Sequence, residues 1–365
     1  MSPRPQSAFK AIVILLTLLA LETVALIWLW ISSRPSNLAP RPVENAVARA
    51  YPGVDFTKIY SGMSAKDIDE LQRDCLAVRN VYAPFLEFRP LPMTNRFVTI
   101  TSAGFRVGQT EQPWPPLKTD FVVFVFGGST TFGFGVRSHE TVVAALEREL
   151  AALYPQRKVQ CYNFGVPYYY STQERILFEK LLEEGAIPNL AIFIDGLNDF
   201  YYADGTAALT EKLTHFIAPD LPSEPKLELS TEPDRATAVR GVIHRYEAHT
   251  RTAKAIGDAY GVRTIFVGQP VPFFYFPIPR PEMYPFRVTW IDHHELCRWG
   301  YDRFEAAARS GEFGSNFVWC GDAFANATNI MYVDAFHYSA AGATMLARSF
   351  VVRASEQRLL SSALR

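Results

Sequence analysis

The sequence has few cysteines and nearly equal numbers of acidic and basic residues. Each of these two features excludes a class of protein. Four cysteines in 365 residues, with no CxxC pair, do not suit a disulfide-dense miniprotein or a zinc site. The 36 Lys and Arg residues balance 37 Asp and Glu residues, so the chain lacks the basic surface that neutralises nucleic-acid phosphates. No repeat of fixed period suggests a solenoid. With 48 % hydrophobic residues, the chain is expected to fold and not to bind nucleic acid.

One long hydrophobic run lies near the start of the chain. Residues 11–31 contain one ionisable side chain, Glu22, and no proline or glycine. As a helix rising about 1.5 Å per residue, this run matches the hydrocarbon thickness of a bilayer. A cleavable signal peptide would have a shorter apolar stretch, and a buried core helix would be amphipathic. The sequence therefore predicts a short tail at residues 1–10 and an uncleaved transmembrane signal anchor at residues 11–32.

The orientation of this anchor follows less directly from the sequence. Arg4 and Lys10 precede the hydrophobic run, while Arg34 and Arg41 follow it, so the positive-inside rule barely separates the two orientations. No second long run follows, and four cysteines are compatible with an oxidising compartment. We expect a single-pass membrane protein whose globular part is extracytoplasmic, on the periplasmic side of the inner membrane if the source is Gram-negative.

The rest of the chain divides by composition into three parts. Residues 33–63 lack apolar periodicity at their start and predict a linker. Residues 64–119 predict an extension with a short amphipathic helix, since Ile68, Leu71 and Cys75 recur at helical spacing, and a strand-like run before a glycine turn. Residues 120–360 predict the main domain.

Within that domain, apolar runs alternate with amphipathic stretches. Five runs read as strands, in the order FVVFVFG from residue 121, RKVQCYNFG from 157, LAIFID from 190, VRTIFVG from 262 and IMYVD from 330. Continuous apolar runs are typical of parallel strands covered on both faces, and helices between strands imply right-handed crossovers. The predicted fold class is α/β, a flavodoxin-like three-layer α/β/α sandwich with a five-stranded parallel sheet, preceded by one transmembrane helix.

Polar and glycine residues follow four of these strands, where ligands bind in such sheets. Ser129 lies in GGSTTFG, Gly165 in NFGVPYYYS, Asn198 in DGLNDF, and Asp334 and His337 in VDAFHYSAAG. A serine nucleophile needs a base, an acid that orients the base, and donors for the oxyanion. His337 and Asp334 fit the base and the acid, and the amides of Ser129, Gly165 and Asn198 fit the donors.

Taken singly, these motifs are weak, because a Gly-Gly-Ser turn is often only a turn and an Asn-Asp pair often caps a helix. Together and in this order, the four blocks resemble the SGNH hydrolase superfamily, or GDSL-type esterases, and in particular membrane-anchored bacterial-type members with a GGST nucleophile block. The resemblance covers about residues 120–360. It implies Ser129 as nucleophile, His337 as base, Asp334 as its partner, and Ser129, Gly165 and Asn198 as the oxyanion hole. Gly128 stands where the family's name motif has Asp, which we interpret as a subgroup feature.

The function expected from this resemblance is that of a membrane-tethered serine esterase. It would hydrolyse O-acyl or acetyl esters, on an envelope glycan or lipid, through an acyl-enzyme and without a metal or cofactor. Two alternatives remain open at this point. An O-acyltransferase would use the same triad with a sugar hydroxyl in place of water, and a catalytically inactive member would serve as a glycan-binding or assembly protein.

Aromatic residues beside the blocks suggest where a substrate would lie. Tyr168 and Tyr169 follow Gly165, and a proline-rich loop after the fourth strand carries Phe273 and Phe274. These four side chains are predicted to line a substrate cleft, the alternative being a lid packed on the protein's own core.

Two further segments tempt a chemical interpretation. The segment DHHE at residues 292–295 has metal-ligand residue types, but consecutive helical side chains point about 100° apart, so no metal site is predicted there. Cys297 and Cys320 lie in a segment that reads as loop-rich, and a disulfide between them is compatible with an extracytoplasmic location. Cys75 and Cys161 are expected to be free buried thiols.

Overall fold

A computed structural model describes residues 9–10, 16–17, 21–23, 45–108, 112–210, 213, 229–275, 284–286 and 295–360. The chain divides into two units, Met1–Glu44 and Asn45–Arg365. In the first unit the few described residues are helical, and most of the predicted anchor at residues 11–32 lies outside the described residues. Among the described residues, no helix combines the length and the apolar character needed to cross a membrane.

The second unit is built on a parallel sheet. In the described part of the chain, its five strands are β5 (Phe121–Gly127), β6 (Val159–Gly165), β7 (Leu190–Asp195), β8 (Arg263–Gly268) and β9 (Phe317–Trp319). They lie in the order β6-β5-β7-β8-β9, and every neighbouring pair is parallel. This is the flavodoxin-like order, with its topological switch point between β5 and β7. The predicted α/β class with a five-stranded parallel sheet is confirmed.

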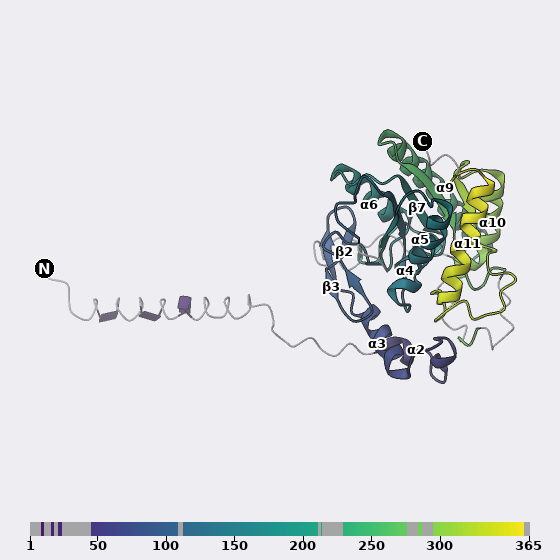
Figure 1. The fold of residues 1–365 in the computed structure, drawn as a ribbon. Helices are drawn as coiled ribbons and strands as arrows, with labels where there is room; N and C mark the ends of the chain where they lie inside the picture. Colours follow the sequence, from purple (N-terminus) through teal and green to yellow (C-terminus); the bar gives the residue numbers. More distant parts are fainter. Residues whose placement is uncertain are drawn as a thin grey trace. The chain divides into compact units, whose positions relative to one another are not determined.

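Helices cover both faces of the sheet (Figure 1). One face packs on α5 (Val142–Leu153) and α11 (Ala340–Glu356), and the other on α6 (Ser171–Glu183), α9 (Glu232–Ala259) and α10 (Glu295–Ser310). Successive strand residues point to opposite faces, so Val123 and Val125 join the first core while Phe124 and Phe126 join the second. Burial on both faces explains why these strands are continuous apolar runs.

The fifth strand differs from the prediction. The sequence pattern places it at residues 330–334, but β9 is Phe317–Trp319, and Tyr332 makes only an isolated antiparallel bridge with Tyr338. The backbone of residues 331–339 closes on itself instead, because Val333 N–H donates to the His337 carbonyl at 2.8 Å and Ser339 N–H to the Met331 carbonyl at 2.8 Å. We name residues 331–339 the Asp–His loop. The Asp–His loop is therefore not a strand of the sheet, and it turns toward the end of strand β5, where Ser129 lies.

The helix α10 is a feature that the sequence pattern did not predict. The pattern indicates a loop-rich segment around Cys297, whereas a helix runs from Glu295 to Ser310. Its buried residues include Cys297, Tyr301 and Phe304, which recur at helical spacing and carry the signal that could have found it.

The segment before the sheet is folded over much of the predicted linker. Composition predicts a linker at residues 33–63, but α2 (Ala46–Ala50) and the 3₁₀ helix η1 (Phe56–Lys58) lie within it, and Tyr60 is buried. Tyr51 and Ile59 pack against the core beside the α5 and α11 face. The extension continues with α3 (Ala65–Leu76), which confirms the predicted amphipathic helix, and the short strands β1 (Asn80–Ala83), β2 (Glu87–Pro90), β3 (Met93–Thr94) and β4 (Thr99–Ile100).

All four cysteines are buried and free. The bridge between Cys297 and Cys320, which the sequence left open, is not present. Cys297 belongs to the core on the α6, α9 and α10 face, whereas Cys320 belongs to the core on the α5 and α11 face. The two thiols therefore pack in different cores, on opposite faces of the sheet.

Candidate active site

The candidate nucleophile, Ser129, lies at the turn from strand β5 into a one-turn helix. Strand β5 ends at Gly127, and α4 (Ser129–Phe132) begins two residues later. A Cβ atom on Gly127 would lie 2.6 Å from Thr131 Cβ, and one on Gly128 would lie 3.0 Å from the Tyr169 carbonyl oxygen. Glycine at both positions therefore allows the strand to turn closely into the helix and present Ser129 at the carboxyl edge of the sheet.

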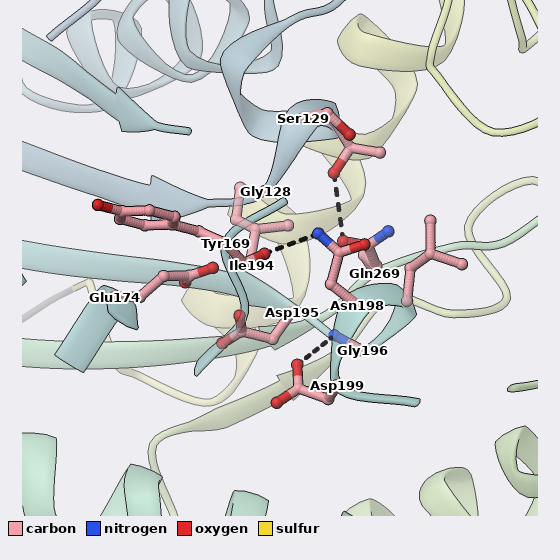
Figure 2. A pocket seen from close by; sticks show the side chains of 12 residues that line it. Gly128, Ser129, Tyr169, Glu174, Ile194, Asp195, Gly196, Asn198, Asp199 and Gln269 are labelled. Atoms are coloured by element: carbon pink, nitrogen blue, oxygen red, sulfur yellow. Dashed lines mark hydrogen bonds between the residues drawn. The ribbon is translucent and has the colours of Figure 1, made fainter. Parts of the chain in front are cut away.

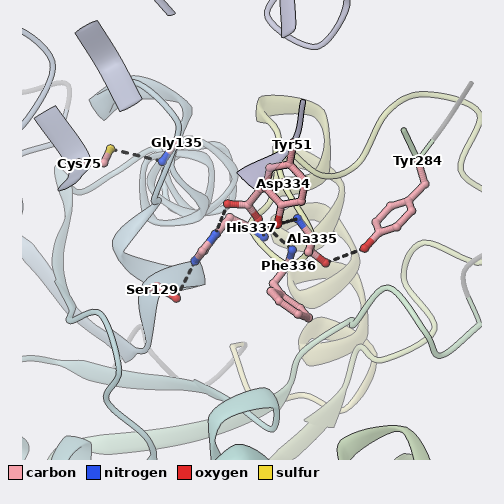
Figure 3. A network of polar contacts seen from close by, with 9 residues as sticks. All are labelled: Tyr51, Cys75, Ser129, Gly135, Tyr284, Asp334, Ala335, Phe336 and His337. Atoms are coloured by element: carbon pink, nitrogen blue, oxygen red, sulfur yellow. Dashed lines mark hydrogen bonds and ion pairs between the residues drawn. The ribbon is translucent and has the colours of Figure 1, made fainter. Parts of the chain in front are cut away.

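A chain of hydrogen bonds connects Ser129 to the Asp–His loop (Figure 3). His337 Nε2 lies 2.8 Å from Ser129 Oγ, and His337 Nδ1 lies 2.6 Å from Asp334 Oδ2. An ionised Asp334 accepts only, so the proton of the neutral imidazole resides on Nδ1 and Nε2 is free to accept from the serine hydroxyl. The order of groups is that of an activated serine nucleophile.

Asp334 is held as a carboxylate by its surroundings. Its side chain is buried, and its Oδ1 accepts hydrogen bonds from Phe336 N–H at 2.9 Å and His337 N–H at 2.8 Å. Burial by itself raises the pKa of Asp334, but attraction to His337 and these hydrogen bonds outweigh burial and lower the pKa below its usual range. The aspartate therefore keeps its negative charge toward the imidazole at neutral pH.

The imidazole also has an aromatic neighbour. The ring of Phe134 lies 4.6 Å from the His337 ring between centroids, tilted by 35°. Phe134 N–H donates to the Ser129 carbonyl at 3.0 Å, so the same short segment fixes the serine and one side of the histidine. This contact limits the rotation of the imidazole out of line with Ser129.

Asn198 follows the neighbouring strand β7 and lies against the turn that precedes Ser129. Strand β7 ends at Asp195, and α7 (Leu197–Tyr201) begins after Gly196, which has a φ of 129°. Asn198 Nδ2 donates to the Tyr169 carbonyl at 2.7 Å (Figure 2). A Cβ atom on Gly128 would overlap this same Nδ2 atom, so the Asn198 amide lies directly against the turn that precedes Ser129.

The backbone N–H of Gly165, which was expected to be an oxyanion donor, already has a partner within the protein. This N–H donates to Asn163 Oδ1 at 3.0 Å, and Asn163 Nδ2 in turn donates to the Thr131 and Phe132 carbonyls at 3.1 and 3.2 Å. A Cβ atom on Gly165 would lie 2.7 Å from the Thr131 carbonyl carbon. Gly165 thus lets β6 pass close to α4, and its amide already has an acceptor there.

Three carboxyl groups are buried beneath the serine turn. Glu174, Asp195 and Asp199 are each at most 4 % exposed, and with Ser129 and Asn198 they line a small cavity of about 10 Å³ (Figure 2). Burial, followed by the charge of Asp195, raises the pKa of Glu174 well above its usual range. Burial and the charge of Asp199 likewise raise the pKa of Asp195. Each of these buried carboxyl groups therefore holds its proton more tightly than a carboxyl group in water does.

Asp199 belongs to a second serine–histidine pair. Ser171 Oγ donates to Asp199 Oδ1 at 2.5 Å and lies 2.8 Å from His249 Nδ1. Ser171 is only 5 % exposed. Burial, then the charges of Arg175 and Arg245, lower the pKa of His249 to about 4, so its ring is neutral at pH 7. This pair resembles the Ser129 pair in its residue types but is closed to a substrate.

The predicted substrate wall is only partly present. Tyr168 is 58 % exposed, and Phe273 is half-buried. Tyr169 and Phe274 are buried instead: the Tyr169 hydroxyl donates to the Phe88 carbonyl, and the Phe274 ring packs on Tyr301. Both side chains belong to the core, and Tyr169 also lines the small cavity beside Ser129.

Two tyrosines contact the Asp–His loop, a role that the sequence predicted for neither. Ala335 N–H donates to Tyr51 Oη at 3.2 Å, and Tyr284 Oη donates to the Ala335 carbonyl at 2.9 Å (Figure 3). Nothing in the local sequence pattern could have paired these positions, since Tyr51 and Ala335 are 284 residues apart. Where the structure describes the chain, no group of three His, Cys, Asp or Glu side chains could hold a metal ion, and residues 292–294 lie outside that part.

The sequence matches no protein-family model and no curated protein sequence. Similar solved structures exist. A lipase from a goat rumen metagenome has a TM-score of 0.42 and 13 % identity over 64 % of this chain and 97 % of its own. A variant of an acetyl-xylooligosaccharide esterase from Geobacillus stearothermophilus has a TM-score of 0.39 and 15 % identity over 65 % and 95 %.

A third similar structure is a member of the lipolytic G-D-S-L family from Veillonella parvula, with a TM-score of 0.37 and 10 % identity over 63 % of this chain and 96 % of its own. By name the three proteins are a lipase, an esterase and a lipolytic protein.

Proposed function

We propose that the protein is a serine carboxylic ester hydrolase with Ser129 as its nucleophile. The observation that carries this proposal is the unbroken hydrogen-bond chain from Asp334 through His337 to Ser129. Each member has the chemistry its position requires: a buried carboxylate, an imidazole with a free Nε2, and a hydroxyl at the open edge of a sheet.

The reaction would proceed through an acyl-enzyme. Ser129 Oγ attacks the ester carbonyl carbon while His337 Nε2 takes the hydroxyl proton, and Asp334 stabilises the imidazolium. The carbonyl oxygen gains the negative charge, and His337 returns the proton to the departing alcohol. Water then attacks the acyl-enzyme with His337 again as base, which releases the acid and restores the Ser129 hydroxyl.

We propose two donors for the developing oxyanion. The backbone N–H of Ser129 is one, and the second hydrogen of Asn198 Nδ2 is the other, because the first is held by the Tyr169 carbonyl. The contact between Asn198 and the Gly128 position supports this arrangement. Gly165, whose N–H is bound to Asn163, is left out of the proposed oxyanion hole.

The location and the substrate class are proposed from the sequence. The hydrophobic run at residues 11–31 supports a membrane tether, and the half-buried Phe273 and exposed Tyr168 remain candidates for the substrate wall. The substrate would then be an O-acyl or acetyl ester of an envelope glycan or lipid, outside the cytoplasm. All four thiols are free, so this placement is supported by the hydrophobic run and not by a disulfide.

The proposal is tested by covalent labelling and turnover of the full chain in detergent. A fluorescent alkyl phosphonate should label the protein, and acetyl to dodecanoyl nitrophenyl esters should reveal hydrolysis. Ser129→Ala should abolish both signals. Ser171→Ala is the matched control, because Ser171 also contacts a histidine but is buried, and it should keep the labelling. Labelling that survives Ser129→Ala would exclude Ser129 as the nucleophile.

A separate experiment tests the location. A reporter that is active only outside the cytoplasm, fused after residue 365, should be active in cells. Deletion of residues 11–31 should release the protein from the membrane fraction. An inactive reporter, with the protein still in the membrane fraction, would place the globular part inside.

A further inference from the structure

Several backbone groups of the Asp–His loop bind partners within the loop, whereas both backbone groups of Ala335 bind side chains from outside it. Asp334 Oδ1 accepts from the N–H groups of Phe336 and His337, and Val333 N–H donates to the His337 carbonyl. Ala335 is buried, and both of its backbone groups bind side chains from elsewhere. The loop thus depends on external partners at the residue directly after Asp334.

Those partners are two tyrosines from different parts of the chain. Tyr51 Oη accepts from Ala335 N–H at 3.2 Å, and Tyr284 Oη donates to the Ala335 carbonyl at 2.9 Å (Figure 3). Tyr51 follows α2 in the segment before the sheet, while Tyr284 lies in the proline-rich segment after β8. Together they bind both polar groups of one peptide residue.

The two tyrosines support each other through a shared aromatic neighbour. The Phe286 ring lies 5.1 Å from the Tyr51 ring and 5.4 Å from the Tyr284 ring, in edge contacts. Tyr284 also contacts Tyr332 of the Asp–His loop at 5.9 Å. Such packing fixes the hydroxyl groups in space, so their hydrogen bonds can hold the loop in one position.

Both hydroxyls keep their protons at any pH at which an ester hydrolase works. Burial, followed by the nearby negative charge of Asp334, raises the pKa of Tyr51 and of Tyr284 far above its ordinary value. The Tyr284 hydroxyl therefore remains a donor, and neither ring adds a second negative charge beside Asp334.

We propose that Tyr51 and Tyr284 are positioning residues that clamp Ala335 and so keep Asp334 and His337 aligned with Ser129. This inference rests on the proposed esterase function. It makes the segment around α2, which the sequence indicated as a linker, a part of the active centre.

The first test compares Tyr51→Phe and Tyr284→Phe with a matched control. Each variant removes one hydroxyl and keeps the ring. Tyr154→Phe is the control, because Tyr154 is as buried as Tyr284 and its hydroxyl donates to the distant Leu360 carbonyl. We expect kcat for nitrophenyl acetate to fall about 2- to 12-fold in each clamp variant, the value of one ordinary hydrogen bond, with KM unchanged.

The double variant Tyr51→Phe/Tyr284→Phe should lose more than the product of the single losses, because either tyrosine alone still holds Ala335. Tyr154→Phe should lower the thermal midpoint by a similar amount but keep kcat. If the clamp variants keep kcat within twofold of that control, the two tyrosines only support the fold and the proposal is wrong.

A second readout does not depend on turnover. Amide hydrogen exchange over residues 333–338 should accelerate in Tyr51→Phe and in Tyr284→Phe but not in Tyr154→Phe. Unchanged exchange there overturns the clamp whether or not the enzyme is active. Conversely, a wild type that neither turns over esters nor reacts with a phosphonate refutes the proposed function, while faster exchange in the variants would still support the clamp on the loop.

Discussion

A single methyl group at Gly128 tests the geometry of the proposed oxyanion hole. The backbone there has φ −80° and ψ −152°, which alanine also adopts, so Gly128→Ala should fold. The added Cβ atom would lie 3.0 Å from the Tyr169 carbonyl oxygen and would overlap Asn198 Nδ2. The carbonyl is backbone on a buried residue, so the Asn198 side chain is the group that moves.

The size of the effect follows from the loss of one preorganised donor. Such a loss lowers kcat by about 100- to 1,000-fold, or about 2.7 to 4 kcal/mol of transition-state stabilisation. KM for nitrophenyl acetate should change little, because the donor acts mainly on the charge that develops in the transition state. Steady-state kinetics on purified variants measure both quantities. Gly241→Ala in α9 is the control, since a Cβ atom there meets nothing within 4 Å.

A double variant decides whether the effect passes through Asn198. Asn198→Ala alone should cost as much as Gly128→Ala alone. If the methyl group acts by displacing Asn198, then Gly128→Ala/Asn198→Ala should be no worse than either single variant. Losses that multiply, or a Gly128→Ala enzyme with wild-type kcat, would refute the placement of Asn198 as a donor to the substrate.

Three other measurements test the triad, the buried carboxyls and the thiols. Ser129→Ala, His337→Ala and the double variant should each lose on the order of 10⁴-fold or more in kcat, because the residues act as one unit; retained activity in any of them would refute that unit. Because the pKa of Glu174 is raised in the folded protein, the unfolded chain releases this proton at a lower pH, near the ordinary pKa of 4.5. The free energy of unfolding of the wild type should therefore decline as pH rises above that value. Glu174→Gln should flatten this decline in thermal unfolding measured from pH 5 to 8, and parallel curves would contradict the assignment. Cys297 and Cys320 should react with maleimide after denaturation without reductant, whereas a need for reductant would reveal a bridge.

Much of the fold could be predicted from local pattern. Strands β5 and β7 are continuous apolar runs because both faces of each are buried, and their bounds agree with the runs that begin at residues 121 and 190. The order of strands and motifs also determined which side chains would gather. Ser129 and Asn198 follow parallel strands, and the carboxyl ends of such strands meet at one edge.

Other features depended on which distant segments meet, and local sequence does not encode that. The hydrogen bond from Ala335 to Tyr51 joins residues 284 positions apart. The composition around Tyr51 is typical of a linker, so it predicted no contact between Tyr51 and the site. Cys297 and Cys320 are close in sequence, yet the sheet divides them between two cores. Gly165 lies in the expected block, but the partner of its amide, Asn163, became visible only in the structure. The sequence by itself determined the elements and the candidate chemistry, because burial and glycine turns leave local patterns. The tertiary structure alone decided which hydrogen bonds hold that chemistry in place, because those partners are chosen by packing.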